Sequence, residues 1–188
     1  MHRISAQRLK QFCLALMVQE HVPAAEAELI ADHLIEAELC GVSSHGVSRV
    51  AIYLQRLHAG VVNAAWSYEI EQEYPSSILW NAHNSMGMVT GVHAMELCIS
   101  KARESGCCLV GANHSNHFGM AGYYAKMAAQ AGMIGLCGTN APPNIAPWGS
   151  YRAYLGTNPL AISAPSHQDP LVLDMAPSVV AMGKVILA

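Results

Sequence analysis

The sequence is poor in charged residues and in phenylalanine, and it lacks long uninterrupted hydrophobic runs. Only 12% of its 188 residues are charged, whereas 52% are hydrophobic, which favours a folded chain over a disordered one. No block of Lys and Arg accompanies the formal net charge of −3, and this argues against a nucleic-acid partner. Because no apolar run reaches the length of a membrane helix, we expect no membrane-spanning segment.

Several motifs with well-understood chemistry are also absent. The sequence contains no GxGxxG, no GxxxxGK[ST] and no GxSxG, and its few acidic residues are dispersed. None of the 6 cysteines forms a CxxC pair, so we expect all of them to be reduced and buried, in a cytoplasmic chain. With these motifs absent, the reaction type that we expect is proton transfer by a histidine combined with chemistry that a cofactor supplies.

The periodicity of apolar residues predicts a mixed α/β fold. Helical spacing predicts three helices in the first sixty residues, the first after a Ser5 cap and the third over 47–59. A strand, a helix and a strand follow one another over 107–138, which favours a βαβ crossover with a parallel strand pair. Further strands are predicted at 69–74, 78–80, 160–164 and 171–173, and a long helix over 86–104.

The stretch Ser43–Arg49 places an imidazole, a hydroxyl and a guanidinium between the second and third predicted helices. His45 can move a proton near neutral pH, and Arg49 can hold a carboxylate in a fixed fork. A small hydroxy- or keto-acid needs both groups. The alternative is that His45 caps a helix and Arg49 is a solvated charge. A nucleophilic Ser44–His45 pair is disfavoured, because sequence neighbours seldom face each other well enough for proton abstraction.

A second polar cluster, 113–119, contains two histidines where a predicted strand ends and a helix begins. Ligands often bind at such a junction, because the backbone N–H groups of the helix start point outward. The alternative is an Asn-rich helix cap with solvated rings. His114 and His117 lie three apart, but no Asp, Glu or Cys stands at ligand spacing, so we expect no metal site.

Two later stretches place polar side chains next to short strands. Thr157 and Asn158 precede a strand and present donors and acceptors there, or they hold a tight turn. Asp174 ends an apolar strand, where it suits a ribose or amide contact or caps the following helix. The final residues, 178–188, are typical of an uncapped helix whose Lys184 is a phosphate contact or a snorkelling surface group, and we expect a homodimer or a fragment.

Five short motifs together resemble the malate/L-lactate dehydrogenase family of the second type, over the whole chain from Ile4 to Ala188. Each motif alone is weak, and their common order and intervals carry the resemblance. They are Ser-His-Gly-x-x-Arg at 44–49, Asn-His-Phe-Gly at 116–119, Ala-Pro-Trp-Gly at 146–149, Gly-Thr-Asn-Pro-Leu at 156–160 and Leu-Asp-Met-Ala at 173–176.

The resemblance implies NAD- or NADP-dependent interconversion of a small 2-hydroxy acid and its 2-keto acid. It implies a helical segment, 1–65, and a partial α/β cofactor-binding region, 66–188, of a dinucleotide fold that is not the usual Rossmann type. By the same resemblance, His45 beside Ser44 gives the proton, Arg49 holds the substrate carboxylate, and His117 is a second candidate for the proton role. The implied cofactor contacts are Asn140, Thr157, Asn158, Pro170, Leu173, Asp174, Met175 and Ala176.

Members of that family are far longer, so we expect this chain to be a truncated amino-terminal portion. One alternative is therefore a catalytically inactive remnant, and another, from the residues alone, is a metal-dependent hydrolase using His114 and His117. Replacing His45 by Ala is expected to abolish activity, whereas replacing His33 is expected to retain it.

Overall fold

The structure of the chain is a computed structural model that describes residues 3–178 and divides into two compact units, Met1–Met120 and Ala121–Ala188. The predicted helix at the end of the chain and Lys184 lie outside the described residues. Both units contain a helix-covered sheet, so the predicted mixed α/β class is confirmed. No helix over residues 3–178 is long and apolar enough to cross a membrane.

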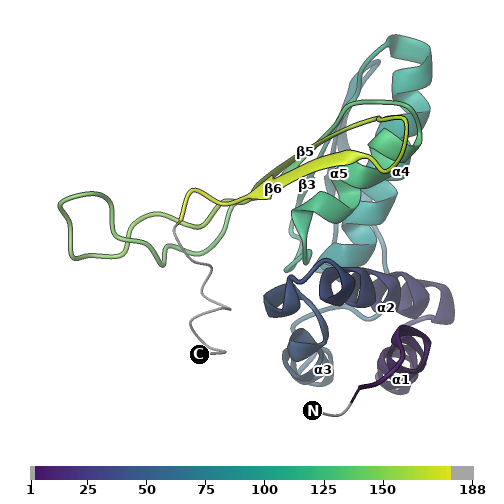
Figure 1. Ribbon diagram of the computed structural model, residues 1–188, viewed down its shortest axis with the longest axis vertical. Helices are drawn as coiled ribbons and strands as arrows, with labels where there is room; N and C mark the ends of the chain where they lie inside the picture. Colours follow the sequence, from purple (N-terminus) through teal and green to yellow (C-terminus); the bar gives the residue numbers. More distant parts are fainter. Residues whose placement is uncertain (1–2, 179–188) are drawn as a thin grey trace. The chain divides into compact units, whose positions relative to one another are not determined.

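Three helices open the first unit: α1 (Ala6–Gln19), α2 (Ala24–Leu39) and α3 (Val50–His58), which lie together in Figure 1. The Ser5 hydroxyl accepts the Arg8 N–H at 3.3 Å, which confirms the predicted cap of the first helix. The helices bury a core to which α4 also contributes; its largest fully buried members include Met17, Ile30, Leu34 and Met88.

The connection between α2 and α3 differs from the prediction. The third helix does not run from 47; two short 3₁₀ turns, η1 (Ser43–His45) and η2 (Val47–Arg49), precede it. Turns of this kind are common next to helix ends, where tertiary contacts replace the regular hydrogen-bond ladder. His45 and Arg49 therefore lie in consecutive tight turns, and only the following residues form a regular helix.

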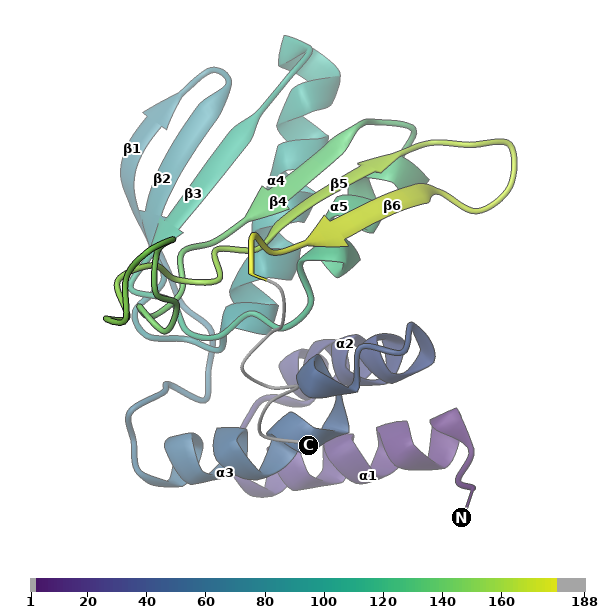
Figure 2. The same ribbon diagram turned by 60° about the vertical axis from the view of Figure 1, so that its left-hand side comes forward.

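The sheet of the first unit contains β1 (Glu69–Tyr74), β2 (Ser77–Asn81) and β3 (Leu109–Asn113), side by side in Figure 2. The first pair is antiparallel and the second is parallel, connected through α4 (Gly87–Ser105). The prediction that residues 107–138 form a parallel strand pair is wrong, because β3 pairs with β2. Local sequence predicts each strand but not its partner, which depends on long-range hydrogen bonds.

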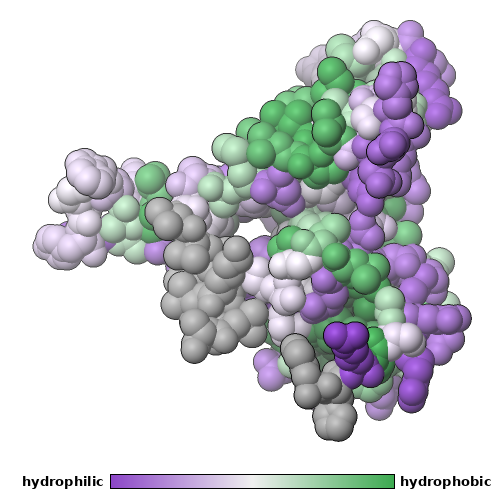
Figure 3. Space-filling model, in the orientation of Figure 1, coloured by the Kyte–Doolittle hydropathy of each residue, from purple (hydrophilic) through white to green (hydrophobic). Residues whose placement is uncertain are grey.

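The second unit packs α5 (Ala121–Gln130) on one face of an antiparallel sheet of β4 (Gly135–Gly138), β5 (Leu160–Ala164) and β6 (Leu171–Met175). The buried side chains Ala161 and Ser163 lie on the face of the sheet that α5 covers. The other face is apolar and exposed, and Figure 3 shows a hydrophobic area where Figure 1 places β5 and β6. Its exposed members are Leu136, Leu160, Leu171, Leu173 and Met175.

The cysteines agree only in part with the expectation from sequence. None of the six, all of which lie in described residues, forms a disulfide, and Cys13 is fully buried. Cys40 and Cys107 are exposed, so the expectation that all six are buried is wrong. Both stand just after the last residues of a helix, at positions where the chain turns at the surface.

Candidate functional site

The turn that carries His45 is held by Glu38 at the end of α2. One carboxylate oxygen of Glu38 accepts the Val47 N–H at 2.8 Å, and the other accepts the Ser43 hydroxyl at 2.9 Å. A Cβ on Gly46 would overlap the Glu38 carboxylate, so only glycine permits this close approach. Glu38 has no signal in the sequence as a site residue, yet it sets the shape of the turn that presents His45.

Within this turn and the next, Ser44 contacts both His45 and Arg49. The Ser44 hydroxyl lies 3.0 Å from His45 Nδ1, and Arg49 Nε donates to the Ser44 carbonyl at 2.7 Å. The expectation that the adjacent Ser44 and His45 do not face each other is wrong, because their polar side-chain atoms lie within hydrogen-bond distance. The Arg49 bond uses Nε and leaves the guanidinium fork of the two Nη atoms outside it.

His117 joins the group from a segment 72 positions further along the chain. Its ring stacks on that of His45 with centroids 5.5 Å apart and planes at 23°. The Tyr53 hydroxyl, on α3, lies 2.7 Å from His117 Nδ1. Sequence reasoning missed Tyr53, although its position four residues after Arg49 places both on one side of a helical stretch.

Burial and positive neighbours govern the electrostatics of this cluster. Burial, reinforced by His45 and two arginines, Arg49 and Arg56, lowers the pKa of His117 from 6.5 to about 4. Burial raises the pKa of the Tyr53 phenol far above its ordinary value of 10. At neutral pH, His117 is therefore an uncharged imidazole next to a phenol that keeps its proton.

His33 on α2 belongs to the same cluster. Its side chain is fully buried, and its Nε2 accepts the Met120 N–H at 2.8 Å. Burial, followed by the charges of His117 and His45, lowers its pKa from 6.5 to about 3. His33 is consequently unsuitable as the control that the sequence suggested, since its replacement acts on the segment that carries His117.

The other polar residues of 113–119 have different surroundings. The Asn116 amide donates to the Asn84 carbonyl at 2.8 Å and tethers the segment, while His114 is exposed and lies 3.0 Å from the Asn113 side-chain oxygen. No group of three His, Cys, Asp or Glu side chains that could hold a metal exists among the described residues.

In the second unit, most of the candidate cofactor residues gather at one edge of the sheet. The carboxyl ends of β4 and β6 and the amino end of β5 meet there, because β5 runs antiparallel to both. The Asn158 side-chain oxygen accepts the Ala141 N–H at 2.8 Å, and Asp174 Oδ2 accepts the Gly122 N–H at 2.7 Å. This edge therefore carries Asn140, Thr157, Asn158, Asp174, Met175 and Ala176.

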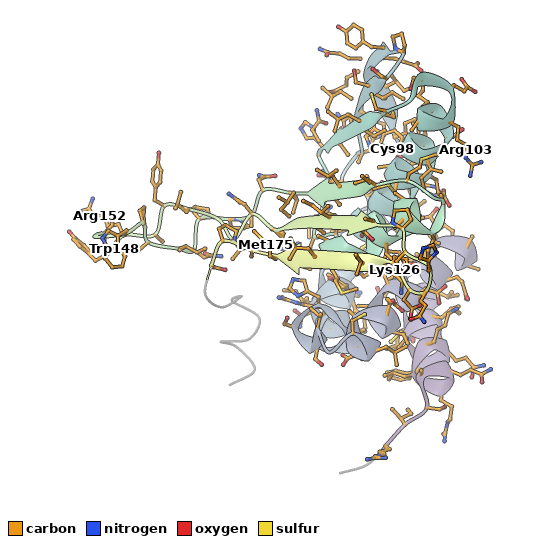
Figure 4. The ribbon with its side chains drawn as sticks, turned by 45° about the horizontal axis from the view of Figure 1, so that its top comes forward. Cys98, Arg103, Lys126, Trp148, Arg152 and Met175 are labelled. Carbon is orange, nitrogen blue, oxygen red and sulfur yellow. The ribbon has the colours of Figure 1, made fainter. Side chains whose placement is uncertain are left out.

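Two of the candidates lie elsewhere on this sheet. Pro170 precedes β6 at the opposite end of the strand, and Leu173 lies in its middle on the exposed apolar face. Asp174 sits beside the second residue of α5, so its carboxylate stabilises the start of that helix. Figure 4 shows Met175 at the end of β6 and Trp148 and Arg152 at the tip of the long loop that follows β4.

Comparison with known proteins agrees with this mixed α/β architecture. The family model described as malate/L-lactate dehydrogenase matches residues 4–188, and the chain belongs to this family. It is 43% identical over 183 residues to the malate dehydrogenase of Pyrococcus horikoshii, covering 97% of this chain and 51% of that protein. It is 40% identical to the L-sulfolactate dehydrogenase of Methanothermobacter thermautotrophicus, covering 99% of this chain and 54% of that protein.

Solved structures show the same likeness. The malate dehydrogenase structure from Pyrococcus horikoshii superposes with a TM-score of 0.96 at 42% identity, covering 98% of this chain and 53% of that one. The sulfolactate dehydrogenase structure from Methanocaldococcus jannaschii superposes with a TM-score of 0.93 at 35% identity, covering 98% of this chain and 54% of that one. The chain thus spans about half the length of the relatives it matches.

Proposed function

We propose that this chain supplies part of an NAD- or NADP-dependent oxidoreductase that interconverts a small 2-hydroxy acid and its 2-keto acid. The observation that carries the proposal is the stack of His45 on His117, with Arg49 in the adjoining turn. Similar proteins named malate, L-sulfolactate and ureidoglycolate dehydrogenase support the substrate class. The division into a helical segment, 1–65, and a cofactor-binding region, 66–188, is part of this proposal.

Arg49 is proposed to bind the substrate carboxylate. Its Nε is already bonded to the Ser44 carbonyl, which orients the planar guanidinium so that the two Nη atoms remain for a bidentate contact. A lysine at this position would lack both the internal bond and the fork. Arg49→Lys is therefore expected to raise KM for the acid more than it lowers kcat.

His45 is proposed to exchange the proton with the substrate oxygen, and His117, neutral near pH 7, to donate a hydrogen bond to the same oxygen. In the reductive direction the carbonyl carbon receives a hydride and the carbonyl oxygen a proton, so that a keto acid becomes a hydroxy acid. A positioned imidazole assists such a transfer by about 10²–10⁴-fold. Ser44, 3.0 Å from His45 Nδ1, orients the His45 ring.

The residues of the second unit fit a nicotinamide cofactor in chemical type. Asn140, Thr157 and Asn158 supply amide and hydroxyl groups, and Asp174 supplies a carboxylate for hydroxyl or amide donors. We propose these four residues, with Pro170, Leu173, Met175 and Ala176, as cofactor contacts. When bound, the cofactor supplies or accepts the hydride. The residues of the chain bind and orient the substrate and exchange the proton with its oxygen.

The experiment is a spectrophotometric assay of NADH and NADPH oxidation with pyruvate, oxaloacetate and sulfopyruvate. It compares the native chain with His45→Ala, His117→Ala and the control His58→Ala, whose imidazole is 86% exposed. Activity with at least one keto acid, lost in the first two variants and kept in the control, supports the proposal. Equal activity in all four proteins would overturn the assigned roles.

A second candidate is a family remnant without activity of its own; the chain spans about half the length of the relatives it matches. Thermal melting with and without saturating NADH or NADPH separates the two, because a ligand that binds the native state raises its melting temperature. An unmoved Tm together with no turnover favours the remnant.

We also propose a homodimer located in the cytoplasm. The exposed apolar face of the second sheet, which includes Leu136, Leu171 and Leu173, supports self-association. Light scattering coupled to size-exclusion chromatography measures the mass directly, and a monomer at micromolar concentration would contradict the dimer.

A further inference from the structure

Two consecutive backbone amides of the segment 117–120 donate to two different histidine rings. The Gly119 N–H donates to His117 Nδ1 at 3.3 Å, and the Met120 N–H donates to His33 Nε2 at 2.8 Å. A backbone N–H can only donate, so each accepting ring nitrogen carries no proton. The neutral rings are therefore opposite tautomers, with the proton on Nε2 in His117 and on Nδ1 in His33.

The Tyr53 hydroxyl agrees with this assignment. It lies 2.7 Å from the same Nδ1 of His117 that accepts the Gly119 amide. Because that nitrogen is an acceptor, the phenol is the donor of the pair. Protonating His117 at Nδ1 would break the Gly119 bond and force Tyr53 to reverse its role, so the surroundings oppose that protonation.

We propose that His33 is a positioning residue for His117: by accepting the Met120 amide it holds the adjacent Gly119 amide against His117 Nδ1 and keeps the His117 proton on Nε2. The proposal rests on the proposed function only in taking His117 as a group that meets the substrate. Tyr53 and the Gly119 amide contact His117 at Nδ1. The Nε2–H on the other side of the ring then donates a hydrogen bond to a substrate oxygen.

The packing around Gly119 supports a direct coupling between His33 and the segment. Gly119 has a positive φ of 76°, and a Cβ at this position would overlap the His33 ring. His33 itself is fully buried on α2. The ring and the backbone of the segment therefore lie in contact, with no side chain between them.

Charged and titratable groups face His117 from several elements of the first unit. Burial, followed by His45, Arg49 and Arg56, lowers the pKa of His117 to about 4, and burial, followed by His117 and His45, lowers that of His33 to about 3, so both rings are neutral near pH 7. Near neutral pH the segment 117–120 therefore determines which ring nitrogen of each histidine carries the proton, and it does not change the charge of either ring. The groups around His117 are His45, Arg49, Tyr53, Arg56 and His33.

The first test is NMR of the imidazole rings in the ¹⁵N,¹³C-labelled 188-residue chain, since nitrogen shifts report the tautomer of each histidine. Near pH 7 we expect the Nε2–H form at His117 and the Nδ1–H form at His33. The reverse tautomer at either ring overturns the proposal, and this measurement requires neither a variant nor activity.

The second test compares His33→Phe, which removes the acceptor, with His33→Gln, whose side-chain oxygen can accept the Met120 amide. In His33→Phe we expect a mixture of tautomers at His117 and a His117 pKa that moves toward 6.5, whereas His33→Gln keeps both closer to native. A merely structural role would destabilise the chain without moving either quantity in the folded state. A folded His33→Phe protein with an unchanged His117 tautomer and pKa would overturn the proposal.

An activity measurement separates this proposal from the proposed function. If both hold, His33→Phe lowers kcat by about tenfold or more with a smaller change in KM, and His33→Gln recovers part of the loss. The expected tautomers in a chain without turnover under any condition would contradict the proposed function and leave the role of His33 intact. Turnover with a native kcat in folded His33→Phe would contradict the role of His33.

Discussion

The two units of this chain hold their candidate residues in different ways. In the first unit, side chains separated by up to 84 positions, from His33 to His117, meet in a group of buried and half-buried residues joined by hydrogen bonds and ring contacts. In the second unit, Asn140, Asn158 and Asp174 are exposed, and the side chain of Asn158 accepts a backbone N–H of the loop after β4, while that of Asp174 accepts one at the start of α5. The comparison teaches that the group proposed for proton transfer is preorganised within its unit, whereas the proposed cofactor residues at the end of the second sheet are largely exposed.

The largest expected effect tests whether the buried group is catalytic. Replacing His117 by Ala removes the ring that stacks on His45 and is expected to lower kcat/KM by about 10²–10⁴-fold. Asn140→Ala at the open edge of the second unit is expected to change mainly KM for NADH. Steady-state kinetics of both variants measures the contrast, and equal kcat losses would remove the distinction between the units.

Acidification is expected to destabilise the first unit through its buried imidazoles. The pKa of His117 is about 4 and that of His33 about 3 in the folded chain, both below the ordinary 6.5. The unfolded chain therefore binds more protons in this range, so their contribution is fully present above about pH 6.5 and is lost as pH falls toward 4 and 3. At roughly 1.4 kcal/mol per pKa unit the loss amounts to several kcal/mol.

Urea unfolding at about pH 7 and about pH 5 measures this loss. The matched variant is His33→Gln, which lacks one of the two titrating rings and is expected to lose less stability between the two values. An unfolding free energy that does not fall on acidification in the native chain would contradict the neutral state of both rings.

A glycine pair tests the close packing at His33. Gly119→Ala adds a Cβ that overlaps the His33 ring at a positive φ of 76°, and we expect a loss of about 3 kcal/mol in the free energy of unfolding. Gly132→Ala has a similar φ of 81° but nothing within 4 Å of the added Cβ, so about 1 kcal/mol is expected. Denaturant titrations of both variants give the difference in the free energy of unfolding. Equal losses would show that backbone strain alone, and not overlap with the His33 ring, causes the destabilisation.

The smallest expected effect concerns the open edge of the second unit. Asp174→Ala removes the acceptor of the Gly122 N–H near the start of α5 and is expected to cost about 1 kcal/mol, as for other helix-capping carboxylates. Asp169→Ala, in the exposed turn before β6, is the control and is expected to cost less than about 0.5 kcal/mol. A larger loss from Asp169→Ala would contradict the capping role of Asp174.

Much of the local structure could be predicted because its signals are local. The Ser5 hydroxyl caps the first helix, and Gly106, at a φ of 82°, ends α4, since each acts on backbone groups within a few residues. The pairing of β3 with β2 could not be predicted from the same patterns. Strand partners are chosen by contacts between distant segments, which the alternation within a strand does not encode.

The candidate site shows the same division. His45, Arg49 and His117 stand out in the sequence because polar side chains are dense there in an otherwise apolar chain. Tyr53, Glu38 and His33 do not stand out, because a tyrosine or histidine on an apolar helix face is ordinarily a core residue. Their roles depend on atoms of the 43–47 turn and the 117–120 segment that reach them only in the folded chain.

By itself the sequence determined the helices, most of the strands and which side chains are able to move a proton or hold a carboxylate, because propensity, capping and side-chain chemistry act over a few residues. Only the tertiary structure decided that consecutive amides of one backbone segment donate to His117 and to His33, and that they select opposite tautomers. The physical reason is that an imidazole takes the proton arrangement of whatever donors fold against it. The Gly119 amide is local to His117, but Tyr53 lies 64 positions from His117 and the Met120 amide lies 87 positions from His33.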